Sequence, residues 1–156
     1  MGVIVSVTGG EKYKAVLQKI ADIGLGVKAG IPKGATSTDG KSIPTYAAFN
    51  EFGTSRIPPR PFLQTTAKDQ GAKWVATVAA QTQGNTTDPA AWKRAMVLTG
   101  ETMKADIQRT IQSGSFAPNA PATVRAKARK GKVEPDHPLI DTGQMLASVW
   151  YEVVEK

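Results

Sequence analysis

Three prolines within four residues, Pro58, Pro59 and Pro61, are the feature that most constrains how this chain can fold. Proline fixes φ near about −65° and has no backbone donor, so neither a helix interior nor a central strand can run through this stretch. Arg60 lies between two of the prolines and is biased toward an extended conformation, because Pro61 follows it. The sequence therefore predicts a stiff connection between two separate elements.

The residues on either side of this connection have helical patterns. Aromatic side chains three apart predict a short helix over 45–52, which Gly53 ends. Pro61 suits the first position of a second helix, with an apolar stripe that runs for about five turns. Asp88 and Pro89 then supply the N-cap and first residue of the longest helix, which Gly114 stops.

Strands are expected near both ends of the chain and after its first helix. Alternating apolar residues predict them over 3–7, 25–31 and 148–154. A Thr8–Glu11 capping box opens the first helix, and Gly24 closes it. We therefore expect one α+β domain over 1–156, a small antiparallel sheet packed by two long central helices and joined by long loops.

Two further segments are expected to be mobile. They cover about 32–42 and 115–138, where turn formers or prolines replace any apolar period. A short basic helix over 122–129 interrupts the second segment. After it, Asp141 is predicted to be the N-cap of a single helical turn.

The excess of positive charge is largely local. The formal net charge is +7, from 20 Lys and Arg against 13 Asp and Glu, and five of the cations lie close together. These are Arg125, Lys127, Arg129, Lys130 and Lys132. Such a cluster suits contact with DNA or an acidic partner, but no aromatic residue lies within it to stack on a base.

The chain offers few groups for catalysis. Its single histidine, His137, lies in a proline-flanked loop, and there is no cysteine. No phosphate-binding glycine motif or nucleophile elbow is present. We expect neither enzymatic activity nor a metal or other cofactor, and no apolar run approaches the length of about 20 residues that a membrane span needs.

Two ordered motifs resemble a known family. The first is Asn50-Glu-Phe-Gly-Thr followed by Ile57-Pro-Pro-Arg-Pro-Phe-Leu63, and the second runs from Pro118 through Pro138-Leu-Ile-Asp-Thr-Gly-Gln-Met-Leu146. Together they resemble the head–tail joining or tail-completion (neck) proteins of tailed bacteriophages. That group is similar to minor tail protein Z and to the Mu-type virion-morphogenesis proteins.

The resemblance implies a structural virion protein, made in the host cytoplasm and built into the neck or tail. Copies would form a closed ring, expected to have roughly six-fold symmetry. Its partners would be connector or portal-side proteins, the tail terminator or tail tube, and DNA passing through the lumen; no membrane is implied. We assign the interface to Arg56, Pro58, Pro59, Arg60, Pro61, Phe62 and Trp150, with the five clustered cations as possible contacts to DNA or a partner.

Other functions stay open at this point. A tail terminator, which caps the tail tube, is the nearest alternative, and a small basic nucleic-acid-binding protein is an alternative of another class. Among the tryptophans, Trp74 and Trp92 lie on apolar helical stripes and are expected in the core, whereas Trp150 is the better candidate for exposure.

Overall fold

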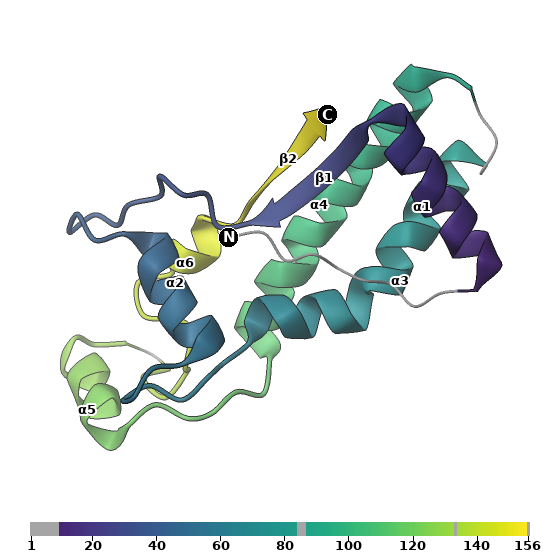
Figure 1. Ribbon diagram of the computed structural model, residues 1–156. Coiled ribbons are helices and arrows are strands. Elements are labelled where there is room, and N and C mark those ends of the chain that lie inside the picture. The colour runs from purple at the N-terminus through teal and green to yellow at the C-terminus, as the bar shows by residue number, and fades with distance from the viewer. Residues whose placement is uncertain (1–9, 84–86, 133, 156) are drawn as a thin grey trace.

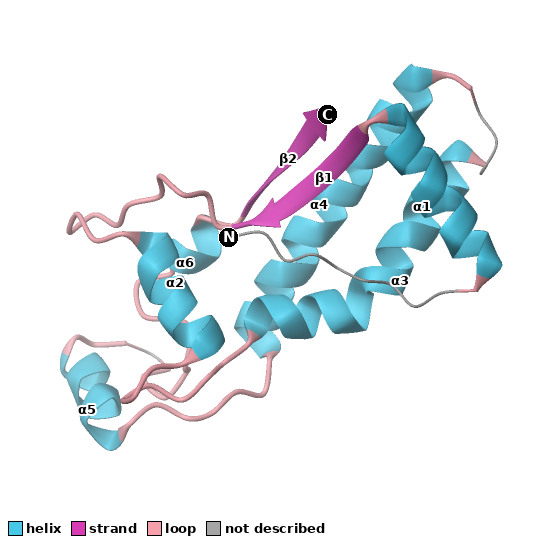
Figure 2. Ribbon diagram, viewed as in Figure 1, coloured by secondary structure: helices cyan, strands magenta, loops and turns pink. Residues whose placement is uncertain are grey.

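The computed structural model describes residues 10–83, 87–132 and 134–155. They form helices and one antiparallel strand pair, which confirms the expected α+β class (Figures 1 and 2). The order is α1 (Glu11–Ile23), β1 (Leu25–Gly30), α2 (Ile43–Phe52), α3 (Phe62–Thr82), α4 (Pro89–Ser113), α5 (Pro121–Arg129), α6 (Gln144–Ala147) and β2 (Trp150–Glu155). The strand expected over 3–7 and Thr8 lie outside the described residues. Glu11 is the first residue of α1, with Gly10 as the N-cap, so the predicted placement of Glu11 as the third helical residue is wrong.

The strand pair joins segments that are far apart in the sequence. β1 and β2 run antiparallel from Leu25 opposite Glu155 to Gly30 opposite Trp150. The same register places Val27 opposite Val153. Side chains alternate between the two faces of a strand, so this register places Leu25, Val27 and Val153 on the face that packs against the helices.

Helix α4 is the centre of the fold, since it contacts both strands and also α3 (Figure 1). Gly100 allows the close approach of α4 to β2. A Cβ atom at that position would lie 2.1 Å from Cδ2 of Tyr151. The hydroxyl of Tyr151 donates a hydrogen bond of 2.9 Å to Oε1 of Glu101, one residue further along α4.

Two clusters of buried apolar residues form the core. One gathers Phe62, Ile107, Ile111 and Val149 with neighbours from α2 and the C-terminal segment. The other includes Val16, Val75, Met96 and Trp92 and lies among α1, α3, α4 and the sheet. Trp74 and Trp92 are both buried, which confirms the prediction for these two residues.

A buried carboxylate joins α3 to α4. Asp106 accepts hydrogen bonds from Nε1 of Trp74 at 2.9 Å and from Nη1 of Arg109 at 2.6 Å, and it also contacts Lys73. Burial opposes ionisation of Asp106. The two hydrogen bonds and the charge of Lys73 outweigh that cost, so the pKa of the Asp106 carboxyl is lowered.

The predicted N-cap at Asp141 is wrong. Helix α6 begins at Gln144, and Gly143 before it has the left-handed φ of 76°. Gln144 instead turns its amide toward the loop that precedes α2. Its Nε2 donates to Oγ1 of Thr38 at 2.7 Å, and its Oε1 accepts from the backbone N–H of the same residue at 3.0 Å.

No helix among the described residues is apolar over a length that would cross a bilayer.

Candidate functional site

The end of α2 is fastened to the beginning of α3 by Glu51. Its side chain is 2% exposed. The carboxylate accepts hydrogen bonds from the backbone N–H groups of Leu63 at 2.8 Å and Gln64 at 2.9 Å. A helix leaves its first N–H groups without intrahelical partners and carries a partial positive charge there. Glu51 therefore caps α3 from another helix, in place of the proline that precedes α3.

The turn between the two helices needs a glycine. Gly53 has a φ of +75°, and a Cβ there would lie 3.0 Å from the carbonyl oxygen of Ile57. Oγ1 of Thr54 then accepts from the backbone N–H groups of Arg56 and Ile57. This local bonding satisfies the turn without help from another element.

Arg60 connects the first motif to the second. Its guanidinium donates from Nε to the carbonyl of Ala117 at 2.7 Å, from Nη2 to the carbonyl of Pro118 at 2.9 Å, and from Nη1 to Oδ1 of Asn50 at 2.9 Å. The Asn50 amide in turn donates to the carbonyl of Tyr46. The planar, fixed fork of the guanidinium suits three acceptors held in one place.

Arg60 and Phe62 therefore do not project from the surface as a docking arm, because both side chains are directed into their own chain. Arg60 is 5% exposed and Phe62 is fully buried in the core. Arg60 lies in the loop between α2 and α3, and its side chain turns into its own chain. Arg56, Pro58 and Pro59 are exposed, and Pro61 is half-buried.

The five clustered cations do not act alike. Lys127 is buried, and its Nζ donates to the carbonyls of His137 at 2.7 Å and Ile140 at 2.6 Å. Arg125, Arg129 and Lys130 are exposed, and Lys132 is half-buried. Lys127 therefore joins α5 to the segment that precedes α6, in addition to lining the surface that the sequence assigns to DNA or a partner.

The segment expected to be mobile over 115–138 has several internal bonds. Helix α5 forms where the sequence predicts it. Asn119 donates from Nδ2 to the carbonyl of His137 at 3.0 Å, and Nε2 of His137 lies 2.8 Å from the carbonyl of Gln112. That contact requires the proton on Nε2, since a carbonyl only accepts.

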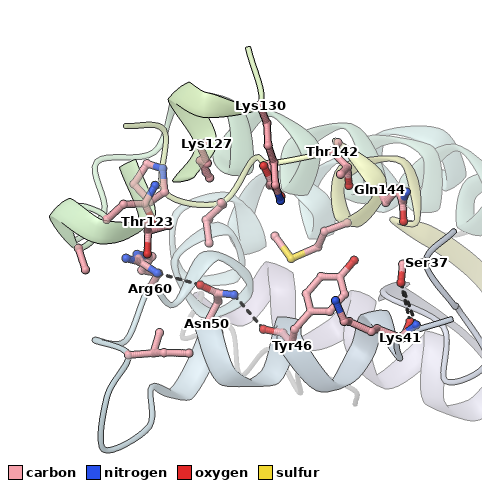
Figure 3. A pocket seen from close by; sticks show the side chains of 18 of the residues that line it. Ser37, Lys41, Tyr46, Asn50, Arg60, Thr123, Lys127, Lys130, Thr142 and Gln144 are labelled. Atoms are coloured by element: carbon pink, nitrogen blue, oxygen red, sulfur yellow. Dashed lines mark hydrogen bonds between the residues drawn. The ribbon is translucent and has the colours of Figure 1, made fainter. Parts of the chain in front are cut away.

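These elements enclose a groove of about 590 Å³, which we call the motif groove because both family-like motifs line it (Figure 3). One wall comes from α2 and the loops beside it, and the opposite wall comes from α5. The third side is the segment that leads into α6. Its polar lining residues include Asp39, Lys41, Tyr46, Arg56, Arg60, Thr123, Lys127, Lys130, Asp141, Thr142 and Gln144.

The groove is positively charged. Five basic side chains and two acidic ones line it. Lys41 and Asp39 form an exposed ion pair of 2.6 Å, which offsets one charge of each sign. Burial lowers the pKa of the Arg60 guanidinium and is also the main cause of the lowered pKa of Lys127. Among the described residues, no carboxylate forms an ion pair with Arg60 or with Lys127.

Exposed aromatic side chains lie outside this groove. Phe49 and Phe52, three residues apart on α2, are 46% and 60% exposed. Trp150, at the start of β2, is 58% exposed, which agrees with the expectation from the sequence. Its ring lies under the ammonium of Lys104, 5.6 Å from the nitrogen, and stacks on Tyr151.

Sequence reasoning missed Glu51 and Asn119. Glu51 could have been found, because a lone carboxylate four residues after Ala47 falls on the buried stripe of α2. Asn119 carries no such signal. In the described part of the chain, no group of three or more His, Asp or Glu side chains could hold a metal ion.

Comparisons with protein-family models, curated proteins and solved structures found no match to this chain.

Proposed function

We propose that this protein is a structural component of a tailed-phage virion, the tail-completion or head–tail joining ring at the neck. The observation that carries the proposal is the docking of the two family-like motifs on one another. Arg60 of the first motif donates to Pro118, where the second begins, and both motifs line one groove. Segments far apart in the sequence thus pack together as a single module, which supports a common role for the two motifs.

Exposed apolar side chains support assembly into a ring. Isolated exposed aliphatic residues are ordinary, but adjacent exposed aromatic rings are enriched at protein interfaces. Phe49 and Phe52, three residues apart on α2, form such a pair, and Pro58 and Pro59 in the following loop are exposed as well. Trp150 lies on a different element. A ring needs two different surfaces that meet head to tail, and we assign them to the α2 pair and the Trp150 end of β2.

The test is the oligomeric state of purified protein. We expect ring-sized particles by mass photometry and negative-stain microscopy, and Phe52→Ser should shift them to monomer. Leu17→Ser, which changes a 39% exposed side chain on α1, is the matched control and should leave the rings intact. Protein that stays monomeric at every concentration and is absent from purified virions would contradict the proposal. Reconstruction of the neck would place the ring there or, for a tail terminator, at the end of the tail tube.

A second candidate rests on α5. Arg125 and Arg129 are exposed on this short helix and Lys130 is exposed just after it, which suits phosphate contacts. A nucleic-acid-binding protein would bind duplex DNA with an affinity that falls steeply with salt, and Arg125→Gln with Arg129→Gln would weaken that binding.

A further inference from the structure

Two buried cations line the motif groove with no carboxylate of the described residues at ion-pair distance, although the charges of Asp141 and Asp136 act on Lys127 from further away. Arg60 and Lys127 are 5% and 7% exposed. The hydrogen bonds that each donates go to carbonyl and amide oxygens, which carry no net charge. Neither forms an ion pair with any carboxylate among residues 10–83, 87–132 and 134–155. Buried charges are normally paired, because leaving water is costly for an ion.

Donor capacity also remains on both groups. A guanidinium has about five N–H donors and an ammonium about three. The described acceptors take three from Arg60 and two from Lys127. The groove therefore has positive charge in its lining, on two groups that have more N–H donors than the hydrogen bonds described here use.

The rim carries further cations at a suitable spacing. Thr123 and Lys127 line the groove from α5, where a spacing of four residues places them on one face of the helix, and Lys130 lines it from the position just after α5. Arg56 adds a cation from the opposite wall. Lys130 and Arg56 form no ion pair within the described ranges. Asp141 is the one acidic lining residue outside the Lys41–Asp39 pair.

We infer that the motif groove binds an extended acidic segment of a partner protein, with its Asp or Glu side chains directed between Arg56 and Lys130 toward the two buried cations. Carboxylates would supply the missing negative charge and accept the remaining N–H donors. Thr142 supplies a neutral hydrogen-bonding group in the lining for the peptide backbone.

Peptide fits the groove better than nucleic acid does. The lining includes apolar side chains, among them Ile57, Leu139 and Met145, which suit a peptide of mixed composition. A duplex presents a convex, uniformly charged surface that cannot enter a concave site of this size. Tyr46 is the one aromatic lining residue, whereas single-strand binding sites stack successive bases on several.

The inference deepens the proposed function. It rests on that function only in naming the partner, because the acidic segment would belong to a neighbouring neck protein. Binding itself is a property of the soluble chain and can be measured whether or not rings form. Peptide binding without ring assembly or virion incorporation would contradict the proposed function alone. Rings that assemble normally but bind no acidic peptide would contradict the groove inference alone.

The experiment uses fluorescence anisotropy with a short labelled peptide that alternates glutamate with serine. The comparison probes are the glutamine–serine peptide, a labelled DNA single strand and a DNA duplex. We expect the glutamate peptide to bind in preference to all three. Arg56→Gln combined with Lys130→Gln should weaken binding by about tenfold, the effect of losing two exposed ion pairs.

The matched control uses two cations of α5. Arg125→Gln combined with Arg129→Gln removes the same charge from α5, but neither residue lines the groove. This control should bind the glutamate peptide as wild type does. Equal loss in both double variants, no peptide binding by wild type, or preference for either DNA probe would overturn the inference.

Discussion

Replacing Arg60 with alanine is expected to lower the free energy of unfolding by about 2–4 kcal/mol. The substitution leaves the carbonyls of Ala117 and Pro118 and the Asn50 amide oxygen without their donor. A buried acceptor that loses its partner costs about 1–3 kcal/mol. Three such costs do not add fully, because water can enter the vacated space and the desolvation cost of the guanidinium disappears.

Urea unfolding followed by tryptophan fluorescence measures the effect. Arg56→Ala is the control, since Arg56 is an exposed cation in the same loop and its loss should change stability by no more than about 0.5 kcal/mol. Arg60→Lys should recover only part of the loss, because an ammonium cannot reproduce the planar fork. An Arg60→Ala variant with wild-type midpoint and slope would refute the assignment of Arg60 as an internal clamp.

Three further outcomes follow from the described contacts. Glu51→Ala should cost about 1–2 kcal/mol in urea unfolding, because α3 loses its cap, and wild-type stability would contradict the capping role. Gly100→Ala should destabilise despite a gain of about 1 kcal/mol in helix propensity, since the new Cβ would overlap Tyr151; a rise in melting temperature would refute this packing. The lowered pKa of Asp106 gives stability that is complete above the unfolded carboxyl value of about 3.9 and is lost as pH falls toward the folded value. Asp106→Asn should flatten that part of the stability–pH curve, and an unchanged curve would contradict it.

Much of the fold follows from local sequence signals. Asp88 and Pro89 start α4 as predicted, and the Asp88 side chain accepts from the N–H of Ala90 at 2.9 Å. Gly24 ends α1 in the left-handed conformation. These signals act within one helical turn, so the sequence contains all of the physics that they need.

The site was harder to predict because its contacts join distant segments. The direction in which Arg60 points depends on where residues 117–118 lie, and nothing near Arg60 in the sequence indicates that position. The same holds for Lys127, whose acceptors are His137 and Ile140. At Asp141 a local signal existed, but Gly143 in a left-handed conformation moved the start of the helix.

The pairing of β1 with β2 also means that the sheet is one of the last parts of the protein to fold. Strand β1 cannot pair until β2 has been made, because Leu25 lies opposite Glu155. Helices α3 and α4 are consecutive in the sequence and can pack as soon as both have been made. Until then, Gly100 faces water on the side of α4 that Tyr151 later covers. In a pulse-labelling hydrogen-exchange experiment on folding chains, backbone amides at the α3–α4 contact should therefore be protected early and those of the two strands late. The surface near Trp150 would then be the last to form.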